Sequence, residues 1–152
     1  MGQGELVRRL RQAERIALDT AVFIYAFEKH PRYGLLAQAV FRALSTGQCR
    51  AVASVVVLGE VLVGAKRAGD AQLVSHYRTL FRYFPGLETV EVDWAVVERA
   101  SELRVRYGIP MPDAIHLGTA LARNARLFVT NDVRFKQVVE LEVLLLSEFL
   151  DP

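Results

Sequence analysis

RIALDTAVFIYAF, residues 15–27, is an apolar segment with one acidic residue, Asp19, and one threonine, Thr20, side by side near its middle. Arg15 to Leu18 is predicted as a short strand, and Asp19 or Thr20 is placed to cap a helix that follows through Phe27. A strand that leads directly into a helix is the start of a β-α unit, in which successive strands run parallel. Asp19 is therefore predicted at the carboxyl end of a strand, where sheets of this kind bind ligands.

The rest of the chain repeats this alternation. Further strands are predicted at residues 50–53, 89–92, 126–130 and 143–146. Apolar residues at helical spacing predict helices at 35–44, 55–66, 70–84, 94–107 and 113–124. We therefore expect an α/β fold, a single-domain three-layer α/β/α sandwich with a mainly parallel sheet of about five strands.

The amino terminus is predicted to lie outside this alternation. Residues 1–14 are interpreted as an amphipathic extension and residues 15–150 as the domain. Leu6, Val7 and Leu10 recur at helical spacing among arginines. This pattern fits a helix that docks on the domain and equally one that holds a partner.

The composition is that of a globular protein in a reducing compartment. Of 152 residues, 52% are hydrophobic and 24% charged, and the formal net charge is only +2. Cys49 is the single cysteine, so no internal disulfide forms. The longest apolar run, residues 52–65, is broken by Glu60 and is shorter than the roughly 20 residues of a membrane-spanning helix. We expect a cytoplasmic protein without a membrane partner.

Three more acidic residues fall at informative positions. In the stretch PMPDAIHLGTAL (residues 110–121), Pro112 suits the first turn of a helix and places Asp113 there, where an acid is also an ordinary helix-stabilising residue. Glu60 interrupts an apolar helix, so it either points to solvent or meets a counter-ion. Asp132 follows a predicted strand, as Asp19 does.

These residues carry a recognisable pattern. Its parts are Leu18-Asp19-Thr20 after a strand, Glu60 with Gly64 four residues later, PDAIH at residues 112–116 and TNDVRF at residues 130–135. In this order and at these positions, they make the chain resemble the PIN-domain family, and within it the VapC-like toxin ribonucleases. The resemblance covers nearly the whole chain after the first dozen or so residues.

The resemblance implies an endoribonuclease that depends on Mg²⁺ or Mn²⁺ and leaves a 5′-phosphate and a 3′-hydroxyl. Asp19, Glu60, Asp113 and Asp132 would form the acidic cluster that holds the metal, and Thr130 would orient water or a metal-bound carboxylate. Gathered carboxylates repel one another, and a hard divalent ion relieves that repulsion through oxygen ligands. Such an ion can activate water and neutralise charge that develops on a phosphate.

The neighbours of the acids have simpler interpretations. His116 is expected as a buried structural histidine, with contact to the cleft as the alternative, and Asn131 as a turn residue. Four basic residues near the expected cleft suit either phosphate contact or ordinary solvation. They are Arg123, Arg126, Arg134 and Lys136.

Other chemistries do not fit the sequence. Residues 59–66 lack the Gly-Lys-Ser/Thr ending of a phosphate-binding loop. His30, His76 and His116 are not spaced as zinc ligands, and no G-x-S-x-G motif is present.

The expected partners are an RNA substrate, a small antitoxin protein and a second copy of the chain. Surplus apolar residues of the middle region suggest the homodimer contact. They are Val56, Leu62, Val63, Leu73 and Tyr77. Two alternatives stay open: a PIN-fold RNA-binding or scaffold protein without turnover, and an RNA-processing nuclease with no antitoxin.

Overall fold

A parallel five-stranded sheet forms the centre of the molecule, in the order β3-β2-β1-β4-β5. The structure is a computed structural model and describes residues 2–152. Its strands are β1 (Arg15–Leu18), β2 (Arg50–Ser54), β3 (Leu87–Val90), β4 (Leu127–Thr130) and β5 (Glu142–Leu145). The first strand lies in the middle, so the loops after β1 and β4 meet at the same edge of the sheet.

Seven α-helices and two short 3-10 helices surround the sheet in the described part of the chain. The α-helices are α1 (Gly2–Ala13), α2 (Thr20–Phe27), α3 (Gly34–Ser45), α4 (Val55–Arg67), α5 (Ala71–Tyr83), α6 (Trp94–Tyr107) and α7 (Met111–Ala122). The 3-10 helices are η1 (Val133–Gln137) and η2 (Leu146–Phe149).

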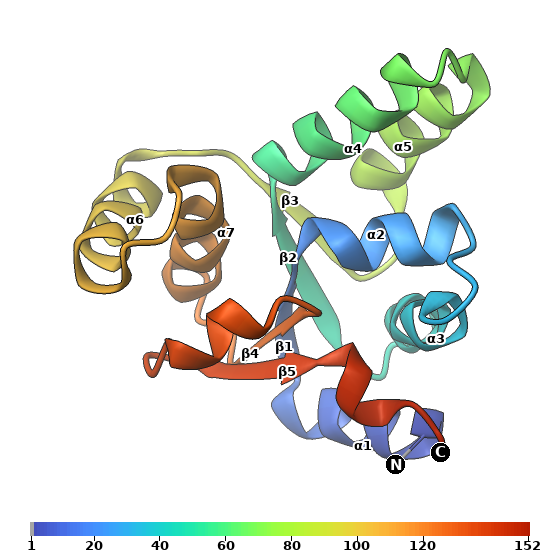
Figure 1. Cartoon of the computed structure of the whole chain (residues 1–152), viewed down its shortest axis with the longest axis horizontal. Helices are drawn as coiled ribbons and strands as arrows, with labels where there is room; N and C mark the ends of the chain where they lie inside the picture. Colours follow the sequence, from blue (N-terminus) through green and yellow to red (C-terminus); the bar gives the residue numbers. More distant parts are fainter. Residues whose placement is uncertain (1) are drawn as a thin grey trace.

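Alternating strand residues divide the core between the two faces of the sheet. Ile16 and Leu18 join the larger core with α1 to α5, whereas Ala17 joins the smaller core with α6 and α7. Figure 1 shows α6 and α7 on one side of the sheet and α2 and α3 on the other. Because side chains along a strand point alternately to opposite faces, apolar runs such as Ile16 to Leu18 are buried on both sides. The predicted three-layer sandwich is confirmed.

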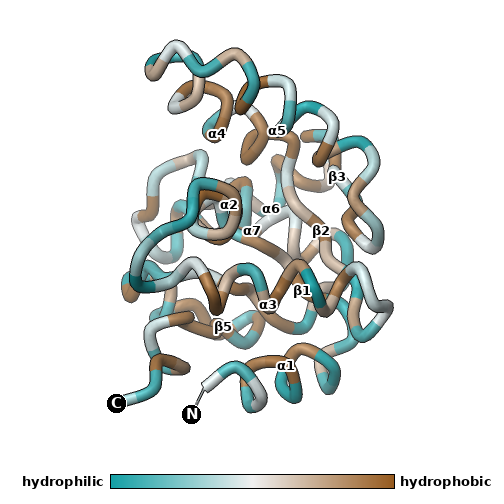
Figure 2. The backbone as a smooth tube through the Cα atoms, turned by 90° about the vertical axis from the view of Figure 1, so that its right-hand side faces the viewer, coloured by the Kyte–Doolittle hydropathy of each residue, from teal (hydrophilic) through white to brown (hydrophobic). Residues whose placement is uncertain are grey.

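Helix α1 docks on the domain. Leu6 and Leu10 are fully buried, and α1 packs against α3 and η2. Figures 1 and 2 both show the carboxyl-terminal residues beside the start of α1. The sequence left open whether residues 1–14 dock on the domain or hold a partner, and the structure shows residues 2–13 docked on the domain. Residue 1 lies outside the described part of the chain.

Two predicted elements were displaced by two residues along the chain. The third strand covers Leu87–Val90 rather than 89–92, because it pairs with β2 from its first residue, directly after the Gly86 turn. Helix α7 begins at Met111, with Pro110 as its N-cap, and ends at Ala122. Asp113 lies in its first turn, as predicted.

Tyr77 was wrongly assigned to the apolar surface of the middle region. Its side chain is fully buried, and its hydroxyl donates to Glu28 Oε2 at 2.7 Å. Leu62 and Leu73 also pack partly against the core, whereas Val63 is 48% exposed. The helical period on α5 identifies an apolar stripe, but it does not tell whether the protein's own core or a partner covers it.

No helix within residues 2–152 has the length and hydrophobicity needed to cross a lipid bilayer.

Candidate functional site

The four predicted acids line one cleft at the carboxyl ends of the strands. Its volume is about 570 Å³, and Asp19, Glu60, Asp113 and Asp132 all contribute to its wall. Residues from α2, α4, α7 and the loop after β4 therefore meet, although the sequence separates them widely. The remaining lining residues are Thr20, Ala21, Ile24, Tyr25, Asn131 and Val133.

Asp19 is the deepest of the four carboxylates. It is 9% exposed, caps α2, and accepts a hydrogen bond from the backbone N–H of Thr20 at 2.8 Å. Burial raises the pKa of Asp19 above its ordinary value, and the hydrogen bond from Thr130 opposes that rise. No Lys, Arg or His in the described residues forms an ion pair with it. Asp19 is thus a buried carboxylate that carries no compensating cation of its own.

Thr130 connects the two loops that carry Asp19 and Asp132. Its hydroxyl donates to Asp19 Oδ2 at 2.6 Å and accepts from the backbone N–H of Asp132 at 3.1 Å. The residue is fully buried at the end of β4. Thr130 therefore fixes one oxygen of Asp19 and the start of the Asp132 loop together.

Glu60 meets a buried histidine and also faces solvent. Its Oε1 lies 2.6 Å from His116 Nε2 and accepts from Thr20 Oγ1 at 2.7 Å, while the side chain remains 40% exposed. The hydrogen bond from His116 lowers the pKa of Glu60. The sequence predicted that Glu60 either points to solvent or meets a counter-ion. In the structure it contacts His116 and also faces the open cleft.

Asp113 projects into the cleft from the first turn of α7. Burial and repulsion from Asp19 raise its pKa, and the nearest cation is Arg134, whose Nη2 lies 3.6 Å from Asp113 Oδ2. Both carboxylates line the same cleft, and the charge of Asp19 disfavours the ionised form of Asp113. They form the negative centre of the cleft, and Arg134 offsets part of its charge at Asp113.

Asp132 forms an ion pair with Arg134, two residues later in the chain. Arg134 Nη2 donates to Asp132 Oδ2 at 2.6 Å, and Arg134 Nε lies 3.0 Å from both carboxylate oxygens. These bonds lower the pKa of Asp132. Arg134 was expected near phosphates or in solvent; in this structure it is the counter-ion of Asp132, exposed at the mouth of the cleft.

The donor set of the cleft fits a hard divalent cation. Within residues 2–152, no three acidic, histidine or cysteine groups already have the spacing of ligands around one ion. The donors are nonetheless carboxylate oxygens, the type that Mg²⁺ and Mn²⁺ prefer, and the lone cysteine is buried elsewhere in the core. Asp19 and Asp113 are the first candidates to hold such an ion, because neither has an ion pair shorter than 3.6 Å.

His116 combines the two interpretations that the sequence allows. It is 3% exposed, as a structural histidine would be, but its Nε2 contacts Glu60 of the cleft, and its Nδ1 has no hydrogen-bond partner within the described residues. The spacing of Asp113 and His116, which places them on neighbouring faces of one helix, indicates this contact with the cleft. The sequence predicts Thr20 only as a helix cap, and its hydrogen bond to Glu60 was not expected.

The chain matches the family model described as PIN domain over residues 16–141. Among solved structures, it is similar to VapBC2 from Rickettsia felis bound to a DNA fragment from its promoter, with 23% identity, a TM-score of 0.68, and 86% of this chain and 97% of that chain covered. A toxin-antitoxin complex from Klebsiella pneumoniae gives 22% identity, a TM-score of 0.66, and the same coverages of 86% and 97%.

A third similar structure is VapC20 from Mycobacterium tuberculosis, described as a toxin that cleaves the sarcin-ricin loop. Its identity is 17%, its TM-score 0.66, and the match covers 84% of this chain and 98% of that chain. At these identities, the similarity concerns the fold. No curated protein sequence matches the chain.

Proposed function

Because the chain belongs to the PIN domain family, we propose that it is a divalent-metal-dependent endoribonuclease that hydrolyses RNA phosphodiester bonds. One observation carries the proposal: Asp19 is a buried carboxylate beside Asp113, and no cation of the described chain is paired with it. Leaving such a charge buried and unpaired is costly, and a bound cation offsets that cost. A structural role does not require this arrangement.

In this proposal, each residue of the cleft has a separate role. Asp19 and Asp113 hold Mg²⁺ or Mn²⁺, which when bound supplies an acidified water and neutralises charge on the reacting phosphate. Glu60, kept ionised by His116, accepts a hydrogen bond from water or another cleft ligand. Thr130 fixes the orientation of Asp19. Asp132 keeps Arg134 at the mouth of the cleft, within reach of an incoming phosphate.

We further propose that the protein is the toxin of a toxin–antitoxin pair and acts in the cytoplasm, bound in its resting state by a small antitoxin. Three of the similar solved structures are described as VapBC assemblies, and one as a toxin-antitoxin complex. Their shared fold supports the proposal. A homodimer through the exposed part of α4 around Val63 belongs to the same proposal; sedimentation at micromolar concentration tests it, and a monomer there contradicts it.

An RNA cleavage assay tests the proposed activity. Wild type and Asp19→Asn are incubated with single-stranded RNA in Mg²⁺, in Mn²⁺ and in EDTA. We expect cleavage by the wild type with either metal, none in EDTA, and loss of at least a hundredfold in the variant. Equal cleavage in all lanes contradicts the metal mechanism, and RNA binding without cleavage by the wild type favours a binding protein without turnover.

A further inference from the structure

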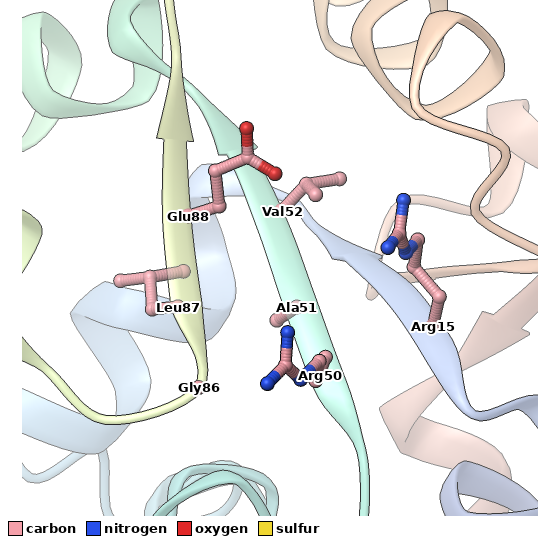
Figure 3. A pocket seen from close by; sticks show the side chains of 7 residues that line it. All are labelled: Arg15, Arg50, Ala51, Val52, Gly86, Leu87 and Glu88. Carbon is pink, nitrogen blue, oxygen red and sulfur yellow. The ribbon is translucent and has the colours of Figure 1, made fainter.

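A second pocket lies at the opposite end of the same strands. It has a volume of about 230 Å³ and is lined by side chains that include Arg15, Arg50, Val52 and Glu88 (Figure 3). Arg15 begins β1 and Arg50 begins β2, whereas Asp19 directly follows β1. The strands thus run from a basic pocket at their amino ends to the acidic cleft at their carboxyl ends.

The two arginines are neighbours in the sheet. Arg15 is the register partner of Arg50 in the parallel pairing of β1 with β2, so both side chains lie on the same face. Like charges at directly opposite positions on adjacent strands destabilise a sheet. Within residues 2–152, neither arginine forms an ion pair, and the Arg50 side chain donates no hydrogen bond.

The one acid of the pocket does not neutralise this pair. Glu88 Oε2 lies 3.3 Å from the Nε of Arg123, which is a different arginine at the end of α7. Arg15 Nη1 donates to the backbone carbonyl of Arg123 at 2.9 Å, which orients its guanidinium at the pocket without removing its charge. The backbone N–H of Arg126 donates to the carbonyl of Arg15, so Arg126 lies beside Arg15 at the same end of the sheet. The pocket keeps a net positive charge.

We propose that the pocket formed by Arg15 and Arg50 binds a phosphate group of the RNA backbone; this rests on the proposed function. The acidic cleft repels polyanions, so the attraction for RNA has to come from basic groups elsewhere on the surface. Guanidinium groups suit phosphate because they donate two parallel hydrogen bonds. The four residues of β1 span about 13 Å. The contacted phosphate therefore belongs to a nucleotide outside the ones at the acids.

Arg50→Gln tests the pocket, because this exposed side chain has no partner to lose within the described chain. Arg82→Gln is the matched control: Arg82 is also exposed, lies on α5, and forms no ion pair with another described residue. Binding of a fluorescent single-stranded RNA is measured by anisotropy in EDTA across a series of KCl concentrations. We expect Arg50→Gln to weaken binding several-fold. The negative slope of log K against log [KCl] should become shallower by about 0.7, because one phosphate contact is lost. Arg82→Gln should change neither quantity.

Cleavage of two substrates separates this proposal from the proposed function. In Mn²⁺, Arg50→Gln should raise the KM for a long single-stranded RNA and leave the cleavage of a dinucleoside monophosphate unchanged, since the only phosphate of that substrate lies at the acids. If Arg50→Gln binds RNA with the affinity and the salt dependence of the wild type, the phosphate site is overturned. A variant that loses affinity only for an acidic protein partner would also overturn it. RNA binding that depends on Arg50 without any cleavage by the wild type would support the pocket and contradict the nuclease.

Discussion

Thr130 and Asp19 are 111 positions apart in the sequence, and the hydroxyl of Thr130 donates to Asp19 Oδ2 at 2.6 Å. Thr130 is the last residue of β4, Asp19 directly follows the neighbouring strand β1, and both residues are buried. The backbone N–H of Asp19 also donates to the carbonyl of Val129 at 3.0 Å, so a backbone and a side-chain hydrogen bond together join the two strand ends that lead to Asp19 and Asp132. The pairing of β1 with β4 therefore fixes the relative positions of the residues that follow the two strands in the cleft.

Thr130→Val should destabilise the protein by about 1 to 3 kcal/mol, because a buried acceptor loses its donor. Loss of that donor also raises the pKa of Asp19 further, so the activity profile should shift to higher pH. Urea unfolding and the pH dependence of RNA cleavage measure the two effects. Thr130→Ser keeps the hydroxyl and should retain the wild-type pH profile; a valine variant with that same profile would refute the role.

His116→Ala should reduce metal-dependent cleavage by roughly 10- to 100-fold, the usual cost of removing a group that orients a metal-site carboxylate. The reason is the 2.6 Å contact between His116 Nε2 and Glu60 Oε1. Without it, the pKa of Glu60 rises towards its ordinary value. His116→Gln, whose amide can donate to Glu60, should recover part of the activity. His76→Ala, at an exposed position on α5, is the control. Full activity in His116→Ala would exclude this function for the histidine.

Asp113→Asn should make the metal-free protein more stable at pH 7. Burial and repulsion by Asp19 raise the pKa of Asp113 in the folded state, so the folded protein binds this proton more tightly than the unfolded chain does. The resulting cost is absent below the ordinary pKa of 3.8 and complete above the folded-state pKa. The stability gain of the variant should therefore disappear as the pH falls to that value.

Urea midpoints of wild type and Asp113→Asn across this pH range measure the gain, and Glu102→Gln, at an exposed position on α6, is the control. A variant that is less stable than the wild type at pH 7 in EDTA would show that the charge of Asp113 is favourable in the empty cleft.

Gly118→Ala should destabilise the protein by about 1 to 3 kcal/mol, as overpacking of a close contact does. A Cβ there would lie 2.9 Å from the carbonyl oxygen of Val96 and 3.0 Å from the nitrogen of Ala100, so α6 would have to move away from α7. Gly64→Ala in α4 meets no atom within 4 Å and should stabilise by about 1 kcal/mol. Thermal unfolding compares the two, and equal shifts would contradict the close helix packing.

The strand-to-helix order of the fold could be predicted because apolar runs such as Ile16 to Leu18 end at capping residues such as Asp19 and Ser54. The third strand was misplaced since its start depends on pairing with β2 after Gly86, which is a tertiary contact. Tyr77 was misassigned for a similar reason: an apolar helix face looks the same whether a core or a partner covers it.

The position of Asp19, Asp113 and Asp132 in one cleft was also predictable, because strand ends and helix starts meet at one edge of a parallel sheet, whereas Glu60, further along α4, was assigned to the cluster through the family resemblance. Their partners were not. The contacts of His116 with Glu60 and of Arg134 with Asp132 depend on side-chain directions that sequence spacing does not determine. The catalytic and metal-binding roles of these residues, and the independence of residues 15–150 from the preceding helix, stay predictions.

Mn²⁺ binding, measured by calorimetry in the absence of RNA, shows directly whether Asp19 belongs to a metal centre, with wild type, Asp19→Asn and Glu102→Gln compared. We expect the wild type and Glu102→Gln to bind Mn²⁺ with the same affinity, and Asp19→Asn to bind it at least tenfold more weakly. Equal Mn²⁺ affinity in Asp19→Asn and the wild type, or no binding by any of the three, would contradict a metal centre built around Asp19.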